Sequence, residues 1–488
     1  MLYLPEQVAI INSEGDIKVK AGAGTGKTTT LVGYAKNNSK KKLMYVAFNK
    51  AIQEEASSRF PSNTVCKTVH SIAYGQVGKF YQAAGKLNNG NLRASDVSKA
   101  LKIAPSVAKS GIDTINEFLY SSDMSIDLAH ALRAGVKNSM QTMAVDCARE
   151  LWKRMTDIHD KSVMLIHDGY LKLFHVEGNS IRGYDTILMD EAQDANPVTT
   201  AIVNASNAEN KVYVGDRNQS IYAFRGAMNA MDSLNAKEFP LRTSFRFGPE
   251  LANVANTILE HSIGDDMRIV GAGSKTMVHH NFTGVEGQVA HIARTNGFLI
   301  GRAIDLIDNG QTFHVVGGVD SLKINMLNDV YKLFMGQKDS FVRGFVGQFD
   351  SYEEFLYHAG ESDDPEMKWL SKTVEKYKKR IPFVVNSIRN TQVADMSKAE
   401  NILVTGHKAK GLEFDTVRIC DDFPTLSEFD SEEGLDEQEC NLIYVAVTRA
   451  KKNIILNEDL ARFMNNPVVN PAVANREGQT KHKRERIA

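Results

Sequence analysis

The sequence predicts an α/β fold with two parallel-sheet cores and helical insertions. Three observations predict this fold. Short apolar runs that end in glycine-rich or acidic turns alternate with amphipathic stretches, as they do in repeated βα units. A chain of 488 residues is long enough for two or more domains that each bury a core. One turn, residues 21–28 (AGAGTGKT), has the composition of a phosphate-binding loop.

The first core is predicted to span residues 1–240. Short apolar runs there read as buried strands, because a parallel strand is covered on both faces. Between His70 and Asp190 lies a stretch far longer than one crossover connection requires. We therefore predict a helical insertion at about 80–175, with a helix at 136–155 from its i, i+3 and i+4 apolar spacing. The predicted strands are 17–19, 43–48, 65–67, 186–189 and 212–214.

The second core is predicted to begin near Leu241 and to run to residue 460. Residues 292–295 followed by 298–307 read as a strand and its helix. A smaller helical accessory insertion is expected at about 320–398, and a basic tail, which also reads as a disordered end, at 461–488. The predicted strands are 288–293, 313–316, 402–404, 417–419 and 453–456.

The glycine-rich turn at 21–28 follows a predicted strand and precedes a segment compatible with a helix. In that context backbone amides and the helix N-terminus cradle phosphate oxygens. Lys27 is expected to reach the terminal phosphates, and the Thr28 hydroxyl to hold magnesium. Ala21 stands where the strict pattern has its first glycine, and the alternative is an ordinary flexible turn. The predicted nucleotide-binding residues here are Ala21, Gly22, Ala23, Gly24, Thr25, Gly26, Lys27, Thr28 and Thr29.

The apolar run at 186–189 ends in two acids, Asp190 and Glu191. The carboxyl end of a buried parallel strand points into the ligand crevice. Asp190 can therefore position magnesium, and Glu191 can orient and deprotonate an attacking water. Taken alone, adjacent acids also fit a solvated turn. Phosphoryl transfer further needs cationic groups, for which Arg246 and Arg449 are candidates, although a single arginine is usually a surface ion pair.

The ordered motifs resemble those of the UvrD/Rep-like superfamily 1 DNA helicases, from Gln7 to about Leu456. Residues 60–75 resemble the F-box DNA helicase branch, although no F-box segment precedes them in this sequence. The resemblance implies two RecA-like P-loop cores, with ATP and Mg²⁺ as cofactors. The motifs are Gln7, the turn at 21–28, and residues 47–50, 68–71, 190–194, 215–226, 244–246, 404–414 and 444–450.

The resemblance implies roles around the nucleotide. Gln7 would read the adenine edge and Phe245 would stack on the base. Gln219 would couple the γ-phosphate to the DNA-binding face. Arg246 and Arg449 would act as arginine fingers, and Glu413 would contact the ribose or phosphate region.

The resemblance also implies a path for single-stranded DNA. Phe224 replaces a tryptophan that many relatives have, and a phenyl ring still stacks on a base. Taken singly, Phe48 and Phe224 also fit core aromatics, and His70 fits a structural histidine. Residues 49–50 and 406–408 also fit turn chemistry. The predicted DNA contacts are Phe48, Asn49, Thr68, His70, Tyr222, Phe224, Arg225 and His407.

The resulting hypothesis is an ATP-dependent DNA helicase or translocase that moves on single-stranded DNA, in the 3′-to-5′ direction by resemblance, and unwinds duplexes. One alternative is a translocase that strips proteins from DNA. Others are an ATP-gated DNA-sensing subunit of a nuclease or defence complex, and a DNA-binding scaffold with a degenerate site. The expected partners are single-stranded DNA and single-strand–duplex junctions, and a further candidate is a separate nuclease, recombinase or single-strand-binding protein.

Composition sets further expectations. The formal charge of −1 does not indicate nucleic-acid binding, which would need local basic surfaces such as residues 40–42, 376–380 and 476–486. The four cysteines show no close pairing, so we expect neither a zinc site nor a disulfide framework. No apolar run reaches membrane-spanning length, and residues 1–10 do not read as a secretion signal. A cytoplasmic location, or a nuclear one in a eukaryote, is expected.

Overall fold

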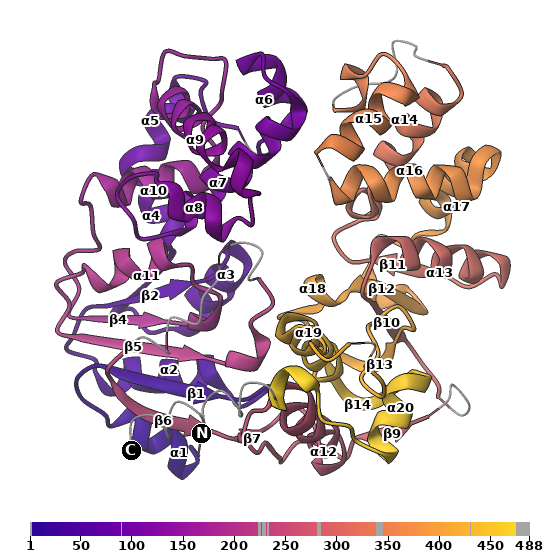
Figure 1. Ribbon diagram of the computed structural model, residues 1–488. Helices are drawn as coiled ribbons and strands as arrows, with labels where there is room; N and C mark the ends of the chain where they lie inside the picture. Colours follow the sequence, from indigo (N-terminus) through magenta and orange to yellow (C-terminus); the bar gives the residue numbers. More distant parts are fainter. Residues whose placement is uncertain are drawn as a thin grey trace. The chain divides into compact units, whose positions relative to one another are not determined.

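The chain forms two compact units, each built on its own parallel sheet (Figure 1). The computed structural model describes residues 2–88, 90–222, 226, 231, 234–280, 285–337, 345–362, 364–429 and 431–474. The first unit comprises Met1–Ala21 and Gly26–Leu241, and the second comprises Gly22–Thr25 and Arg242–Ala488. The predicted α/β class with two parallel-sheet cores is confirmed, whereas the exact domain limits stay predictions.

The sheet of the first unit has the strand order β3-β2-β4-β5-β1-β6, and each neighbouring pair is parallel. All five strands predicted for this core are present. The sixth strand, β6, was missed because its sequence, KEFPL, contains two charged residues and a proline, which suits an edge strand. The strands are β1 (Ile17–Ala21), β2 (Leu43–Ala47), β3 (Thr64–Thr68), β4 (Thr186–Met189), β5 (Asn210–Gly215) and β6 (Lys237–Leu241).

Helices cover both faces of this sheet. One face packs in a cluster that includes Val19, Leu31, Tyr45 and Leu188. The other face, with Met44 and Tyr213, shares a core with the helical insertion. The helices next to the sheet are α1 (Pro5–Ile11), α2 (Lys27–Asn37), α3 (Lys50–Arg59) and α11 (Pro197–Asn204).

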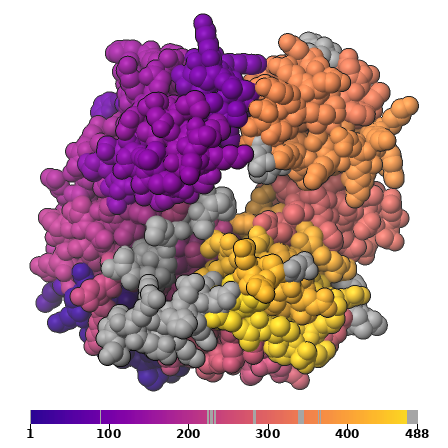
Figure 2. Space-filling view, in the orientation of Figure 1, coloured from indigo at the N-terminus to yellow at the C-terminus, as the bar shows by residue number. Residues whose placement is uncertain are grey.

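The long segment between β3 and β4 is helical, as predicted. Its surface appears mainly in purple in the space-filling view (Figure 2), and its apolar side chains belong to one core with that face of the sheet. The helix predicted at 136–155 begins later, because Gly135 (φ 68°) ends the preceding helix and leaves Val136 in the turn. The helices are α4 (Val69–Ala73), α5 (Lys79–Ala83), α6 (Ala94–Leu101), α7 (Pro105–Tyr120), α8 (Leu128–Arg133), α9 (Gln141–Thr156) and α10 (His167–Val176).

The sheet of the second unit has the order β11-β12-β10-β13-β14-β9, again with parallel neighbours. The five predicted strands are present, and the three-residue edge strand β9 was missed because so short a run has no readable period. A separate ladder joins β7 (Thr243–Ser244) to β8 (Val270–Gly271). The main strands are β9 (Met277–His279), β10 (Val289–Ala293), β11 (Phe313–Val315), β12 (Asn401–Thr405), β13 (Phe414–Ile419) and β14 (Ala450–Ile455).

The second unit also has a helical insertion, placed between β11 and β12. Its helices share one apolar cluster with α13, which follows β10 as predicted. Residues 475–488, which include the basic end of the predicted tail, lie outside the described residues. The helices are α12 (Pro249–Ile258), α13 (Asn296–Asp308), α14 (Ile324–Phe334), α15 (Tyr352–Glu361), α16 (Pro365–Tyr377), α17 (Ile381–Thr391), α18 (Gly406–Ala409), α19 (Glu437–Val447) and α20 (Glu458–Asn465).

Two further findings concern the described part of the chain. None of its helices combines the length and the apolar character that a bilayer crossing requires. Cys66 is partly exposed, whereas Cys147, Cys420 and Cys440 are buried, and all four are free thiols.

Candidate functional site

The glycine-rich turn connects β1 to α2 as the sequence predicts. Gly24 (φ 73°) and Gly26 (φ 77°) adopt left-handed backbone, which glycine favours. Gly26 is the N-cap of α2 and no side chain caps the helix, so the backbone amides of its first turn face the turn. Ala21 is the buried last residue of β1, paired with Leu241, and its methyl group therefore suits this position.

The tip of the turn, residues 22–25, is part of the second unit. The Phe245 amide donates to the Gly24 carbonyl at 2.9 Å, and the Ala23 amide donates to the Tyr444 hydroxyl at 3.3 Å. A Cβ on Gly24 would lie 2.6 Å from Ser244 Oγ, so a side chain there would force a shift. The turn is thus held by one backbone bond and by one bond to a tyrosine hydroxyl, and the Ser244 side chain leaves little room at Gly24.

Asp190 is the centre of a buried hydrogen-bond cluster at the end of β4. Its Oδ2 accepts from the Thr28 hydroxyl at 3.1 Å and from the Tyr45 hydroxyl at 2.7 Å. Its Oδ1 accepts from the Glu191 amide at 2.9 Å. Burial raises the pKa of Asp190, and the neighbouring Glu191 charge raises it further, while Lys27 opposes the shift. The two predicted magnesium residues, Thr28 and Asp190, are therefore in direct contact.

Glu191 is held in an unusual backbone conformation. Its φ of 51° is left-handed, a region that non-glycine residues rarely adopt, and such strain gathers at functional sites. Gln193 Nε2 donates to Glu191 Oε2 at 2.6 Å, and Lys27 Nζ lies 3.5 Å from Glu191 Oε1. The carboxylate is thereby oriented from two sides.

Gln219 is joined to this cluster through Asp216 at the end of β5. Gln219 Nε2 donates to Asp216 Oδ2 at 2.6 Å, and the Asp216 amide donates to Gln193 Oε1 at 3.0 Å. Burial raises the pKa of Asp216, and Lys27 opposes that shift. The sequence did not single out Tyr45, Gln193 or Asp216. Gln193 and Asp216 lie inside the motifs at 190–194 and 215–226, and Tyr45 is the one polar side chain in the strand LMYVA.

The donor set at Thr28 and Asp190 fits magnesium bound together with a nucleotide. Mg²⁺ usually keeps several waters and takes one or two protein carboxylates plus substrate phosphates. One hydroxyl and one carboxylate next to a phosphate-binding turn match that need. Within the described ranges, no group of three or more His, Cys, Asp or Glu side chains forms a metal site of its own.

Two other predicted nucleotide contacts of the first unit use their side chains internally. Gln7 is buried, and its Nε2 donates to Thr30 Oγ1 at 3.1 Å while its Oε1 accepts from the Leu4 amide. The Thr29 hydroxyl accepts from Arg59 at 2.9 Å.

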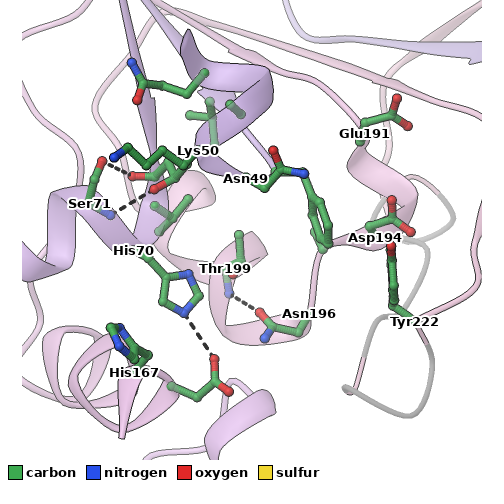
Figure 3. Close-up of a pocket in the computed structure, with 18 of the residues that line it drawn as sticks. Asn49, Lys50, His70, Ser71, His167, Glu191, Asp194, Asn196, Thr199 and Tyr222 are labelled. Carbon is green, nitrogen blue, oxygen red and sulfur yellow. Dashed lines mark hydrogen bonds and ion pairs between the residues drawn. The ribbon is translucent and has the colours of Figure 1, made fainter. Parts of the chain in front are cut away.

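The predicted DNA contacts of the first unit line one cavity of about 880 Å³ (Figure 3). Phe48 and Tyr222 stack in it, with ring centroids 5.4 Å apart and planes inclined by 18°. Glu191 and Asp190 also line this cavity, so it extends to the carboxyl end of β4. The five predicted residues that it brings together are Phe48, Asn49, Thr68, His70 and Tyr222.

Local structure explains how three of these residues are positioned. Asn49 caps α3 by accepting from the Ile52 amide at 2.9 Å, and Thr68 caps α4 by accepting from the Ser71 amide at 3.0 Å. His70 Nε2 lies 3.1 Å from Asp168 Oδ1, which belongs to the insertion helix α10 (Figure 3). Asn49 therefore uses its side chain to cap a helix, as the turn-chemistry alternative proposed, and it also lines the cavity.

The helical insertion contributes cavity residues that the sequence did not identify. Tyr120, His167 and Tyr170 come from α7 and α10, and His167 Nδ1 lies 3.0 Å from the Tyr170 hydroxyl. Burial lowers the pKa of His167, and His70 lowers it further. These residues are distant in sequence from every motif, so no local pattern marks them. Phe224 and Arg225 lie outside the described residues.

The remaining predicted residues belong to the second unit. Arg246 Nε donates to Glu413 Oε1 at 2.8 Å, and its Nη1 donates to the Thr448 carbonyl at 2.9 Å. Arg449 is buried and donates to the Val445 and Leu412 carbonyls. Phe245 is 49% exposed, and His407 is half-buried in α18. Arg246 therefore forms an ion pair with Glu413, whereas Arg449 is buried and its guanidinium is bonded to backbone carbonyls.

Comparison with known proteins gives the same family for both units. The family described as "UvrD/REP helicase N-terminal domain" matches residues 4–240, and "UvrD-like helicase C-terminal domain" matches residues 331–458. The F-box DNA helicase 1 of Gallus gallus is 34% identical, over 94% of this chain and 49% of that protein.

Two further relatives extend the comparison. The F-box DNA helicase protein 1 of Schizosaccharomyces pombe is 30% identical, over 92% of this chain and 56% of that protein. The ATP-dependent DNA helicase PcrA of Leuconostoc citreum is 24% identical, over 52% of this chain and 38% of that protein. The chain thus spans about half the length of the F-box DNA helicases, which it matches at higher identity than PcrA.

Proposed function

Because this chain belongs to the UvrD-like helicase family, we propose that it is an ATP-driven motor that moves along single-stranded DNA and separates duplex strands. Its proposed cofactors are ATP and Mg²⁺. Its proposed substrates are single strands and single-strand–duplex junctions, and the family resemblance implies 3′-to-5′ movement. We also propose a cytoplasmic location, or a nuclear one in a eukaryote.

One observation carries the proposal: Glu191 lines the same cavity as Phe48 and Tyr222. A change at the nucleotide therefore has a short physical route to the residues proposed to grip the strand. Stacked aromatic rings contribute about 1–3 kcal/mol per base to single-strand binding, and they do so with little dependence on sequence. A motor that moves along any strand needs contacts of this kind.

The ion pair between Lys27 and Glu191 supports a role for both in hydrolysis. A γ-phosphate carries more negative charge than one carboxylate, so it would draw Lys27 toward itself. Glu191, still held by Gln193, would then accept a hydrogen bond from water and take its proton. Magnesium, when bound at Thr28 and Asp190, would neutralise charge on the phosphates.

Gln219 is proposed to report the state of the nucleotide to the strand-binding cavity. Its link through Asp216 to Gln193 provides a hydrogen-bonded connection to the residue that holds Glu191. Nearby Tyr222 follows it by three residues in the chain and lines the cavity.

The roles of Gln7, Phe245 and Glu413 at the adenine and ribose stay proposals. Arg246 is proposed as an arginine finger that exchanges Glu413 for phosphate, because a guanidinium binds either group through the same fork. Arg449 is proposed for the same duty, although its side chain is 1% exposed and must leave its carbonyl partners to reach a ligand.

The test is ATP hydrolysis with and without single-stranded DNA, followed by strand displacement on duplexes with 3′ or 5′ overhangs. We expect DNA to stimulate hydrolysis and the 3′ overhang to support unwinding. Lys27→Ala is expected to abolish hydrolysis while single-strand binding persists. DNA-independent hydrolysis, or stimulated hydrolysis in Lys27→Ala, would refute the proposal.

The same motor could displace bound proteins instead of unwinding DNA. Removal of a protein filament from single-stranded DNA, measured beside strand displacement, distinguishes these outputs. Filament removal without strand displacement would favour the translocase alternative.

A further inference from the structure

We propose that Tyr45 is a positioning residue for the magnesium site, whose hydroxyl fixes the Asp190 carboxylate in the orientation that receives the cation. This inference rests on the proposed ATP site at Lys27, Thr28 and Asp190. It assigns a role to a side chain in the middle of β2, outside the phosphate-binding turn.

The geometry of the Asp190 carboxylate carries the inference. Oδ1 accepts one hydrogen bond, from the Glu191 amide at 2.9 Å. Oδ2 accepts two, from Tyr45 at 2.7 Å and from Thr28 at 3.1 Å. Both oxygens are therefore held, and the carboxylate plane is fixed. Two hydroxyls donate to Oδ2. The Thr28 hydroxyl belongs to a predicted magnesium residue, whereas the Tyr45 hydroxyl has no other proposed role.

Tyr45 is itself immobilised. Its side chain is fully buried, and its ring lies against Phe60 with centroids 4.7 Å apart. On the backbone, Tyr45 pairs with Leu188, and the next residue, Val46, accepts from the Asp190 amide at 3.2 Å. The phenol and the carboxylate are thus carried by two adjacent strands in fixed register. A rigid donor on a rigid strand preorganises the acid before a cation arrives.

The composition of β2 argues against a purely apolar role for this side chain. The other residues of LMYVA are apolar and buried, and a phenylalanine would fill the same space without a hydroxyl to satisfy. Burying a hydroxyl without a partner is unfavourable, so the polar atom needs the bond it makes to Asp190. Hydrogen bonds to a charged acceptor are about twice as strong as neutral ones. The hydroxyl therefore acts on Asp190 specifically.

The test is Tyr45→Phe, which removes the hydroxyl and keeps the ring. Magnesium is titrated against the binding of a fluorescent, non-hydrolysable ATP analogue, and in parallel against ATP hydrolysis. We expect the half-saturating Mg²⁺ concentration to rise about tenfold in both assays, as loss of one charge-assisted bond implies. Affinity for the analogue in EDTA should stay unchanged, and hydrolysis should recover at high Mg²⁺.

Tyr213→Phe is the matched control. Tyr213 is equally buried in the same sheet and donates to Asn204 Oδ1, but its side chain belongs to the core on the opposite face. This variant should keep the wild-type magnesium dependence. An equal shift in both variants would mean general loosening of the sheet and would overturn the inference.

Two further results would also overturn it: an unchanged magnesium dependence in folded Tyr45→Phe, or an equal loss of analogue affinity with and without Mg²⁺. A crystal structure of the wild-type chain with Mg²⁺ and the analogue gives a test that needs no variant. There the Tyr45 hydroxyl should still donate to Asp190, and a bond to another acceptor would contradict the proposal. Absence of DNA-stimulated hydrolysis in the wild type would instead refute the proposed function.

Discussion

Lys27 Nζ lies 3.5 Å from Glu191 Oε1, so the cation of the phosphate-binding turn and the acid at the end of β4 form one ion pair. The pair is largely shielded, since the two side chains are 12% and 19% exposed. A phosphate that enters this site competes with the carboxylate for the lysine. If the site binds a nucleotide as proposed, its binding and the activation of the acid are linked through one side chain.

Replacing Glu191 with glutamine should separate hydrolysis from binding. The variant keeps the shape and a hydrogen-bonding partner for Gln193, but it loses the negative charge. We expect the hydrolysis rate to fall by about 10²–10⁴-fold, which is the usual contribution of a positioned base. Nucleotide affinity, measured by fluorescence titration, should be at least that of the wild type, because Lys27 no longer pairs with a carboxylate.

Glu209→Gln is the control for this substitution. Glu209 forms an exposed pair with Lys41, 74% exposed on the glutamate side, and such pairs contribute little. Both variants should unfold at similar temperatures. Hydrolysis by Glu191→Gln within tenfold of the wild type would show that another group activates the water.

Replacing Phe48 with alanine should weaken binding of single-stranded DNA. Loss of one stacking face costs about 1–3 kcal/mol, or about 5- to 150-fold in Kd. Hydrolysis without DNA should stay near the wild-type rate, while the DNA concentration needed for stimulation rises. Fluorescence anisotropy with a labelled oligonucleotide measures the change.

Phe80→Ala serves as the comparison for Phe48. Phe80 is 56% exposed in α5 and does not belong to the described cavity lining. Its removal should leave DNA affinity unchanged. Equal losses in the two variants would place the strand elsewhere on the first unit.

His291 predicts a pH-dependent loss of stability in the second unit. Burial lowers the pKa of His291 to about 3, with a smaller contribution from Arg302, whereas an unfolded histidine titrates near 6.5. Below pH ~6.5 the unfolded chain therefore takes up a proton that the folded chain refuses, and folding weakens until the pH approaches the folded value. Above pH ~6.5 both states are neutral and the effect vanishes.

The matching experiment compares the wild type with His291→Gln, which keeps a donor for Asn401. Between pH 7.5 and 5 the wild type should lose roughly 2 kcal/mol more unfolding free energy than the variant. Urea unfolding at each pH provides the measurement. Parallel pH profiles would mean that His291 does not couple folding to protonation in this range.

The sequence predicted the sheet strands best where both faces are buried. Strands such as β2 and β4 are continuous apolar runs, so composition alone marks them. The edge strands β6 and β9 escaped prediction because an edge tolerates charge, proline and shortness. The helix start near Val136 was also wrong, since a single glycine decides where α8 ends.

The site was predictable to the extent that its residues lie inside short motifs. Thr28 and Asp190 were assigned to one site although they are 162 residues apart, and they lie in hydrogen-bond contact, while the cavity gathers the predicted Phe48 and Tyr222. Tyr45 and Tyr170 could not be found in this way, because their proximity to the site comes from strand register and helix packing. Strand register and helix packing bring together residues that are far apart in the chain, so no regular spacing in the sequence marks them.

The side-chain amide of Gln193 has a consequence for which residues position 193 can accept. Its oxygen accepts a hydrogen bond from the Asp216 amide, and its nitrogen donates one to the Glu191 carboxylate. The side chain thereby connects the ends of β5 and β4 through one acceptor and one donor. A glutamate would preserve the first contact and turn the second into repulsion. A lysine would pair with Glu191 but would leave the Asp216 amide without an acceptor. Only a side chain with a donor and an acceptor at the same reach can satisfy both neighbours, which makes this position intolerant of charge of either sign.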